Sequence, residues 1–445
     1  MTSSPPAQRP PAPEGRPSAQ AEAGAADPAG PPEGRPRPWP ARRFFPVLAT
    51  IGLVLIGMGA TTWWGPAIVG KTTWSLPDDL WGTLVAAERL VHLDLGGLYT
   101  QPTGLVSLPG AAVILVPVAA VIDLAGISLQ VPGPHYPHPD AWLVAGPYQI
   151  AISAVVLFAA DAIAERLGVG LLKRALLAGA GAVTLWNVAV LWGHPEDAVA
   201  VGLLLFAVVA LSDGRPRRSA WLTGAAVAVQ PLVLLALPVV LMVLERRRVA
   251  GYLARAAAPG AVLLAAAAAA NWTATVRAVT RQPNWPRIDH PTPWTSMAPH
   301  LSSGAVAAGP ARALTVLVAC GCALAAGRRW ARARRAGPWD PQILQEVTWW
   351  VAVTLALRSA FEPVMVAYYL WPALAVALIA ASRSWWHLLA TSAVAGTLTF
   401  VSQATWRGPW TWWTPMIVGV ALALFFARVP PGRAARRARP APAGG

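Results

Sequence analysis

Long apolar segments are the feature that most limits what this chain can fold into. A helix needs about 20 mainly apolar residues to cross the ~30 Å hydrocarbon core of a bilayer, and such segments recur along most of the 445 residues. Hydrophobic residues make up 55% of the sequence and charged residues only 12%, whereas soluble domains carry about 25% charged residues. The sequence therefore predicts an all-α, polytopic transmembrane helix bundle in a cell membrane.

About a dozen apolar segments give an expected count of roughly 11–13 membrane helices. The segments are 44–64, 107–126, 143–163, 172–192, 197–212, 219–244, 256–272, 311–327, 346–360, 364–382, 385–402 and 413–427.

Two of these segments do not fit a simple up-and-down order. Segment 219–244 has basic residues at both ends, so we expect a break at Gln230-Pro231 that makes it a re-entrant pair of half-helices. Segment 107–126 contains Pro109 and Pro117, and the charges around it do not say which way it crosses.

The distribution of arginine predicts how the bundle is oriented. The net charge is +15, and most of the arginines lie in the tails and short loops, as the positive-inside rule describes, so no nucleic-acid partner is expected. We expect a disordered cytoplasmic tail at 1–40, a transmembrane domain at 41–428 and a basic disordered cytoplasmic tail at 429–445. Both termini are then cytoplasmic, and loops 64–106, 273–310 and 403–412 lie outside.

Three ionisable residues open one of the apolar helices. In "LWGHPEDAVAVGLLLF", His194, Glu196 and Asp197 follow Gly193 and flank Pro195. Glycine can end one helix, proline suits the first turn of the next, and acidic residues complement the positive end of the helix dipole. Two interpretations stay open: the motif only starts a helix, or it also contacts a substrate on the outer side.

The first outer loop carries a second group of acidic residues. Asp78 and Asp79 precede a short amphipathic helix over 80–92, which ends before Gly96-Gly97. Such a helix lies along the membrane surface. Asp79 is then either a helix cap or a group that a lipid headgroup and a water-borne acceptor could both reach.

The chain resembles the GT-C glycosyltransferases, in particular the actinobacterial, polyprenyl-phosphate-mannose-dependent enzymes of glycosyltransferase family 87. The resemblance covers roughly residues 44–427 and rests on short motifs. They are Asp79-Leu80, the helix 80–92, Gly97-Leu98-Tyr99, Pro109, the "WNVAVLWGHPED" helix start with the break at Gln230, and "LRSAFEPVMVAYYLWPALAVAL". Gln230 stands where the family commonly has lysine, and "SLPG" replaces its Tyr-Pro-Pro step.

The resemblance implies transfer of a sugar, mannose in that family, from a polyprenyl-phosphate donor to a lipid or glycan acceptor, without a cofactor or metal. Such a transfer needs a base for the acceptor hydroxyl and cationic groups for the leaving phosphate. Asp79 is the candidate base and Asp78 its close rival. The substrate-binding candidates are His194, Glu196, Gln230, Arg281, Arg287, His290 and Tyr369.

Two other classes of function fit parts of the sequence. A secondary transporter also uses broken helices, but its ionisable groups lie near the bilayer midplane and its halves repeat. Here the acidic residues gather at the outer ends of the segments and no repeat is visible. A non-catalytic lipid-binding or glycan-binding membrane protein needs no base, and the sequence does not separate it from an enzyme.

Overall fold

The structure is a computed structural model. It describes residues 43–63, 78–100, 105, 107–129, 139–287, 289–301, 304–330, 339–404 and 408–430, and residues from Arg43 onward form one compact unit. The predicted tail at 1–40 lies outside the described residues, and so does all but the first two residues of the tail at 429–445.

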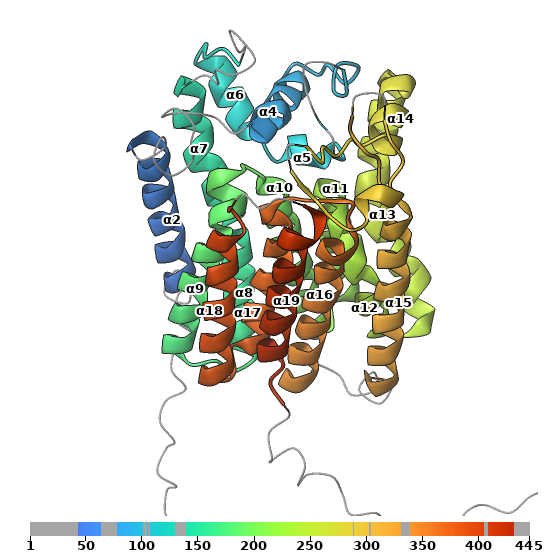
Figure 1. The fold of residues 1–445 in the computed structure, drawn as a ribbon. Coiled ribbons are helices and arrows are strands. Elements are labelled where there is room, and N and C mark those ends of the chain that lie inside the picture. The colour runs from blue at the N-terminus through green and yellow to red at the C-terminus, as the bar shows by residue number, and fades with distance from the viewer. Residues whose placement is uncertain are drawn as a thin grey trace, which may run out of the picture. The chain divides into compact units, whose positions relative to one another are not determined.

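The described chain is a bundle of α-helices (Figure 1). The helices are α2 (Phe44–Trp63), α4 (Asp78–Val91), α5 (Gly110–Val113), α6 (Val116–Leu124), α7 (Pro139–Ser153), α8 (Val155–Arg166), α9 (Leu171–Leu185), α10 (Pro195–Ser212), α11 (Pro216–Val229), α12 (Leu237–Met242), α13 (Arg246–Ala270), α14 (Trp272–Thr280), α15 (Pro310–Trp330), α16 (Pro341–Phe361), α17 (Trp371–Ala381), α18 (Trp385–Val401) and α19 (Pro409–Ala427).

A few short elements complete the described chain. A π-helical turn over Trp186–Leu191 extends α9, and 3-10 turns cover Pro231–Ala236, Thr295–Met297 and Ala367–Leu370. Two short antiparallel strands, β1 (His290–Pro291) and β2 (Val364–Met365), pair with each other.

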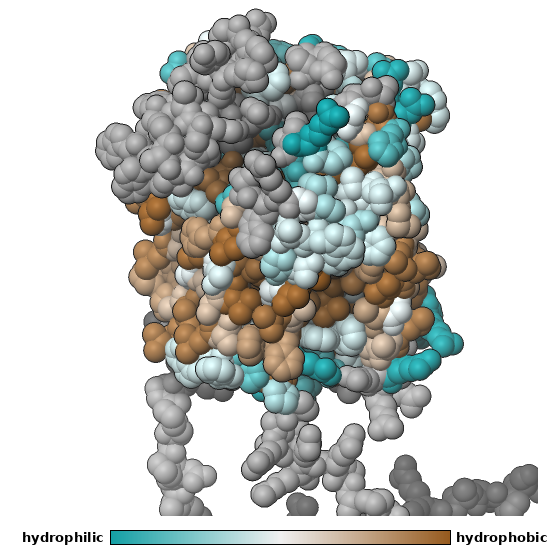
Figure 2. All heavy atoms as spheres, in the orientation of Figure 1, coloured by the Kyte–Doolittle hydropathy of each residue, from teal (hydrophilic) through white to brown (hydrophobic). Residues whose placement is uncertain are grey.

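The all-α bundle is confirmed, and its composition is that of a membrane protein. Seven helical stretches of the described residues are long and apolar enough to cross a membrane, and Pro231–Met242 and Ala367–Ala381 are shorter apolar helices. Figure 2 shows apolar side chains gathered over the middle of one face, with hydrophilic residues toward both ends. All twelve apolar segments contain helix, while the count of 11–13 membrane helices stays a prediction.

The core of the bundle forms around α10 and α17. Helix α17 is buried on every side, and most of α10 is buried as well. Gly202 of α10 lets α8 approach closely, because a β-carbon there would lie 2.7 Å from the Val155 side chain and 3.1 Å from a backbone nitrogen. Helices that are apolar all round belong in such central positions.

Segment 107–126 does not form a membrane-crossing helix. Pro109 and Pro117 divide it into α5, with four residues, and α6, with nine, and both are far shorter than the roughly 20 residues that a crossing requires. They pack against α4, which Figure 1 shows beyond the ends of the bundle helices. The charge conflict in the sequence disappears, because α4, α5, α6 and the start of α7 all lie at one end of the bundle.

The break at Gln230-Pro231 is confirmed. Helix α11 ends at Val229, Gln230 is extended at φ −149° and ψ 115°, and a 3-10 turn begins at Pro231. The chain then returns, since Pro216 at the start of α11 and Arg247 at the start of α13 line the same cavity. Two apolar arms shorter than a crossing helix therefore begin and end at one end of the bundle.

Basic side chains gather at that same end. Asp161 of α8 is buried and accepts hydrogen bonds from Arg43 at 2.6 Å and from Arg174 at 2.6 and 2.7 Å. Arg166 pairs with Asp213 at the far end of α10. Both ends of the described chain, Arg43 and the residues after α19, lie here, so one end of the bundle is basic and the other carries the elements α4, α5, α6 and α14.

Candidate functional site

The candidate site begins at the start of α10, at the end of the bundle that carries α4. Gly193 has φ +65°, a conformation that glycine adopts without strain, and it redirects the chain after the π-helical turn. His194 is the N-cap residue, its backbone N–H donates to the Val188 carbonyl at 2.8 Å, and Pro195 occupies the first turn. The predicted helix start is confirmed, and it holds the His194 ring at the helix N-terminus.

The His194 ring joins two carboxylates from distant parts of the sequence. Its Nε2 lies 3.0 Å from Oδ2 of Asp79, and its Nδ1 lies 2.6 Å from Oε1 of Glu196. The Tyr368 ring stacks on it with centroids 4.1 Å apart. The Asp79 side chain is 56% exposed, whereas those of His194 and Glu196 are 12% and 7% exposed, so the trio runs from the surface into the protein.

Electrostatics favour the charged form of His194. Burial alone would lower the pKa of the imidazole, but the negative charge and hydrogen bonds of Glu196 and Asp79 outweigh it, and the pKa lies well above its ordinary value of 6.5. A doubly protonated ring donates to both carboxylates at once. His194 therefore acts as a cationic link that fixes the orientation of Asp79.

A second polar group lies in the same first turn of α10, around Asp197. This side chain is fully buried, accepts a hydrogen bond from Nε2 of Gln230 at 2.7 Å, and has Oδ2 3.6 Å from Nη1 of Arg358. Neither that Oδ2 nor that Nη1 has a hydrogen-bond partner among the described residues. The break between α11 and α12 contributes to the site, because it places the Gln230 amide within hydrogen-bond distance of the buried Asp197 carboxylate.

Arg358 comes from the last turn of α16 and lies among aromatic and acidic groups. Its guanidinium carbon lies 3.7 Å from the centre of the Tyr369 ring, and its Nε lies 4.0 Å from Glu362. Glu362 is held in turn by Arg312, whose Nη2 lies 2.9 and 3.0 Å from the two carboxylate oxygens. The contact with the Tyr369 ring fixes the plane of the guanidinium. It leaves guanidinium N–H donors that no carboxylate oxygen meets with the geometry of a hydrogen bond.

The loop between α14 and α15 is tied to the chain that leads into α17. His290 and Pro291 of β1 pair with Met365 and Val364 of β2, the Thr292 hydroxyl donates to the Glu362 carbonyl at 2.7 Å, and the indole of Trp294 donates to the Ala360 carbonyl at 2.7 Å. These bonds place the residues before β1 beside the His194 cluster.

Asp289 is the residue of this loop with the most perturbed chemistry. Burial raises the pKa of its carboxyl, the negative charge of Asp79 raises it further and His194 lowers it, which leaves a pKa of about 6. A carboxyl with a pKa in this range can exchange a proton near neutral pH. A second acid therefore lies close enough to Asp79 for that charge to raise its pKa.

The structure brings together five of the predicted site residues, which are Asp79, His194, Glu196, Gln230 and Tyr369. Arg281, at the end of α14, and Arg287 are exposed and show no contact with these five. The His290 ring stacks on Trp412 at 4.1 Å instead, and burial lowers its pKa. Asp78 is the first residue of α4, and its side chain lies outside what the structure describes.

Sequence reasoning missed four residues of the site. Asp197 was expected only to complement the helix dipole, and Arg358, Tyr368 and Asp289 were not singled out. Arg358 had a usable signal, since an arginine inside an apolar segment marks a functional site more often than an exposed one does. Asp289 had none, because its burial depends on the pairing of β1 with β2.

One group of described residues has the geometry to hold a metal ion. Glu88 lies on α4, His92 follows directly after its last residue, and Asp123 comes from the neighbouring α6, with one ligand atom from each within 4.8 Å of the others. His92 already lies 3.3 Å from Asp123. The group is separate from the His194 cluster and carries no step of the chemistry considered below.

A comparison of the sequence with protein-family models found no match, and a comparison with curated proteins found none either. The candidate site is therefore interpreted from its own geometry. An exposed carboxylate held by a cationic imidazole, a nearby carboxyl with a raised pKa and a buried arginine with unsatisfied donors can together move a proton and bind an oxyanion.

Proposed function

We propose that the protein is an integral membrane glycosyltransferase that moves a sugar, mannose by resemblance, from a polyprenyl-phosphate donor to a hydroxyl of a lipid or glycan acceptor. The proposed reaction takes place on the outer side of the membrane. The observation that carries the proposal is the contact of Asp79, on the amphipathic helix α4, with His194 at the start of α10. Two segments that the sequence suggested separately meet in one site.

Asp79 is the proposed base. Its side chain is the most exposed of the trio, so an acceptor hydroxyl can approach it, and its hydrogen bond to His194 fixes one carboxylate oxygen. The acceptor oxygen attacks the anomeric carbon of the donor sugar as its proton passes to Asp79. The bond from that carbon to the phosphate oxygen breaks, and the polyprenyl phosphate leaves with the electron pair.

Arg358 is the proposed hydrogen-bond partner of the leaving phosphate, and His194, whose two ring nitrogens already face Glu196 and Asp79, contributes only its positive charge. A guanidinium can hold phosphate oxygens through parallel N–H donors, and Nη1 of Arg358 is buried with no hydrogen-bond partner among the described residues. The Tyr369 ring beneath the guanidinium keeps its plane fixed. Binding of the phosphate near Arg358 would supply a hydrogen-bond acceptor for Nη1, which has none among the described residues.

The orientation belongs to the same proposal. Basic residues gather at the end of the bundle opposite the site, including the ends of the described chain at Arg43 and Arg428. Under the positive-inside rule that end faces the cytoplasm, and both termini are cytoplasmic. A donor whose phosphate lies at the outer surface then meets Asp79 without crossing the bilayer.

The donor class is tested with purified protein in detergent. Polyprenyl-phosphate-[14C]mannose and a radiolabelled nucleotide-mannose are each offered with extracted membrane lipids and glycans as acceptors. The proposal expects radiolabel to move from the lipid donor alone. Use of the nucleotide donor would contradict it, and tight binding of the lipid donor with no transfer to any acceptor would favour the non-catalytic lipid-binding protein instead.

A further inference from the structure

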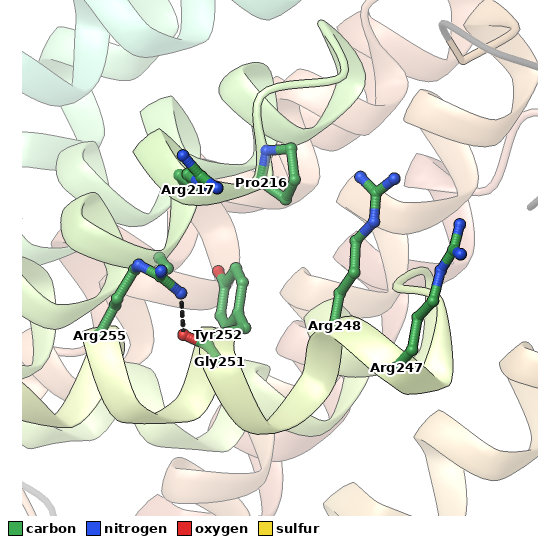
Figure 3. Close-up of a pocket in the computed structure, with 8 residues that line it drawn as sticks. Pro216, Arg217, Arg247, Arg248, Gly251, Tyr252 and Arg255 are labelled. Carbon is green, nitrogen blue, oxygen red and sulfur yellow. Dashed lines mark hydrogen bonds between the residues drawn. The ribbon is translucent and has the colours of Figure 1, made fainter.

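A basic cavity lies at the end of the bundle opposite the candidate site. It has a volume of about 440 Å³ and opens between the first turns of α11 and α13 (Figure 3). Its lining residues are Pro216, Arg217, Ala220, Arg247, Arg248, Gly251, Tyr252 and Arg255. Since α10 has 18 residues at 1.5 Å each, this cavity is about 27 Å from the start of α10 along the helix axis.

Positive charge in the cavity exceeds what nearby carboxylates neutralise. Four guanidinium groups line it, and Glu245 is the one acid paired with them among the described residues, at 2.7 Å from Arg247 and 3.2 Å from Arg248. Arg255 donates to the Gly251 carbonyl of its own helix. A site of this kind attracts an anion with more than one oxygen acceptor.

The wall of the cavity is fixed by packing. Tyr252 is buried, and its hydroxyl is hydrogen-bonded to Ser219 at 3.0 Å and to Thr223 at 2.7 Å, which joins α13 to α11. One turn further, Gly224 allows the two helices to touch, because a β-carbon there would lie 2.8 Å from the Ala256 carbonyl oxygen. The arginines therefore project from a rigid pair of helices, as Figure 3 shows.

Two exposed apolar residues are sequence neighbours of lining residues, on the same two helices. Trp221 follows the lining residue Ala220 and is 52% exposed, and Leu253 follows Tyr252 and is 38% exposed. A free phosphate in water would make no use of them. An anion that carries hydrocarbon chains would make use of these apolar side chains. Its chains can lie against the indole and the leucine while the arginines bind the charged group.

We propose that this cavity binds the phosphodiester headgroup of an anionic phospholipid from the leaflet at that end of the bundle. The phosphate oxygens accept hydrogen bonds from Arg217 and Arg248, one from each helix, and the acyl chains lie along Trp221. The assignment does not depend on the proposed transferase activity. A lipid bound there holds the re-entrant pair α11 and α12 at the first turn of α11, where the pair begins.

The test compares two double variants that remove the same charge. R217Q/R248Q changes two arginines that line the cavity, and R218Q/R246Q changes their sequence neighbours, which do not line it. Each protein is placed in nanodiscs of phosphatidylcholine, and binding of fluorescent phosphatidylglycerol is titrated by energy transfer from the protein's tryptophans. Unfolding midpoints in phosphatidylcholine alone identify a variant that fails to fold.

The wild-type protein and R218Q/R246Q are expected to bind phosphatidylglycerol alike, and R217Q/R248Q about tenfold or more weakly, since two charge-assisted contacts are lost. Equal weakening in both doubles would overturn the proposal, because it would reflect surface charge alone. Binding of fluorescent phosphatidylcholine as tight as that of phosphatidylglycerol would also overturn it.

The source of the phosphate is tested with inorganic phosphate and the variant Trp221→Ser. The variant is expected to weaken phosphatidylglycerol binding and to leave weak competition by inorganic phosphate unchanged. If inorganic phosphate binds as tightly as the lipid and Trp221→Ser has no effect, the cavity takes free phosphate and the lipid assignment is wrong.

Discussion

The stability effect of replacing His194 with glutamine follows from its two carboxylate contacts. The contact with Glu196 is 2.6 Å long and nearly buried, and a hydrogen bond between charged groups in such a place contributes about 1.5–3 kcal/mol. The contact with Asp79 is 3.0 Å long, but Asp79 is 56% exposed, so solvent screening reduces it to about 0–1 kcal/mol. The expected loss in His194→Gln is about 1.5–4 kcal/mol.

The dependence of this loss on pH identifies its cause. The folded-state pKa of His194 is raised above its ordinary value, because its carboxylate partners outweigh the effect of burial. Its stabilisation is therefore fully present below the unfolded-state pKa of about 6.5 and disappears as the pH rises through the folded-state value. The gap between wild type and His194→Gln should be widest near pH 6 and close as the pH is raised.

Thermal unfolding of purified protein in detergent, followed by tryptophan fluorescence from pH 6 to 10, measures that gap. His290→Gln is a matched control, since burial lowers the pKa of His290. Any stabilisation that His290 supplies is present above the unfolded-state pKa of about 6.5 and is lost only as the pH falls below it, so its gap should stay nearly constant from about pH 7 to 10. A His194→Gln gap that stays constant or widens toward pH 10 would refute the assignment of His194 as a cation.

Three further predictions concern the site and its orientation. Arg358→Lys keeps the charge but loses the planar guanidinium, so affinity for the polyprenyl-phosphate sugar should fall about tenfold or more. The dissociation constant is measured on protein with an unchanged unfolding midpoint, and unchanged affinity would remove Arg358 from the site. Asp289 has a pKa of about 6, so the wild-type transfer rate should fall as the pH drops through about 6. Asp289→Asn should lack that step in its pH–rate profile, and a profile that keeps the step would assign the step to another group. An impermeant thiol reagent applied to intact cells should label Leu93→Cys and not Arg246→Cys in a cysteine-free background, and the reverse pattern would invert the topology.

Much of the fold could be predicted because membrane helices are encoded by local composition. The start of α10 follows from Gly193 and Pro195, and the break before Pro231 follows from the missing amide proton of proline. Segment 107–126 shows where composition is insufficient. It reads as an apolar segment like the others, yet it contains Pro109 and Pro117 and forms only helices of four and nine residues, which pack against α4.

The candidate site could be predicted only in part, because its members come from distant segments. Asp79 and His194 each stood out locally, at the first turn of an amphipathic helix and at the start of an apolar one. Nothing local indicated that they touch, or that Arg358 lies 3.6 Å from Asp197. Those contacts are set by how α4, α10 and α16 pack, which depends on shape complementarity across the whole core.

The measurement that tests the central claim most directly is single-turnover sugar transfer by Asp79→Asn. The amide keeps the size of the carboxylate but cannot take the acceptor's proton, so we expect the rate to fall by roughly 10²–10⁴ while the lipid donor still binds. Asp78→Asn should have a smaller effect, and Glu88→Gln, another carboxylate of α4 that does not contact His194, should keep the wild-type rate. Wild-type turnover in Asp79→Asn, on protein of matched folding, would contradict the account.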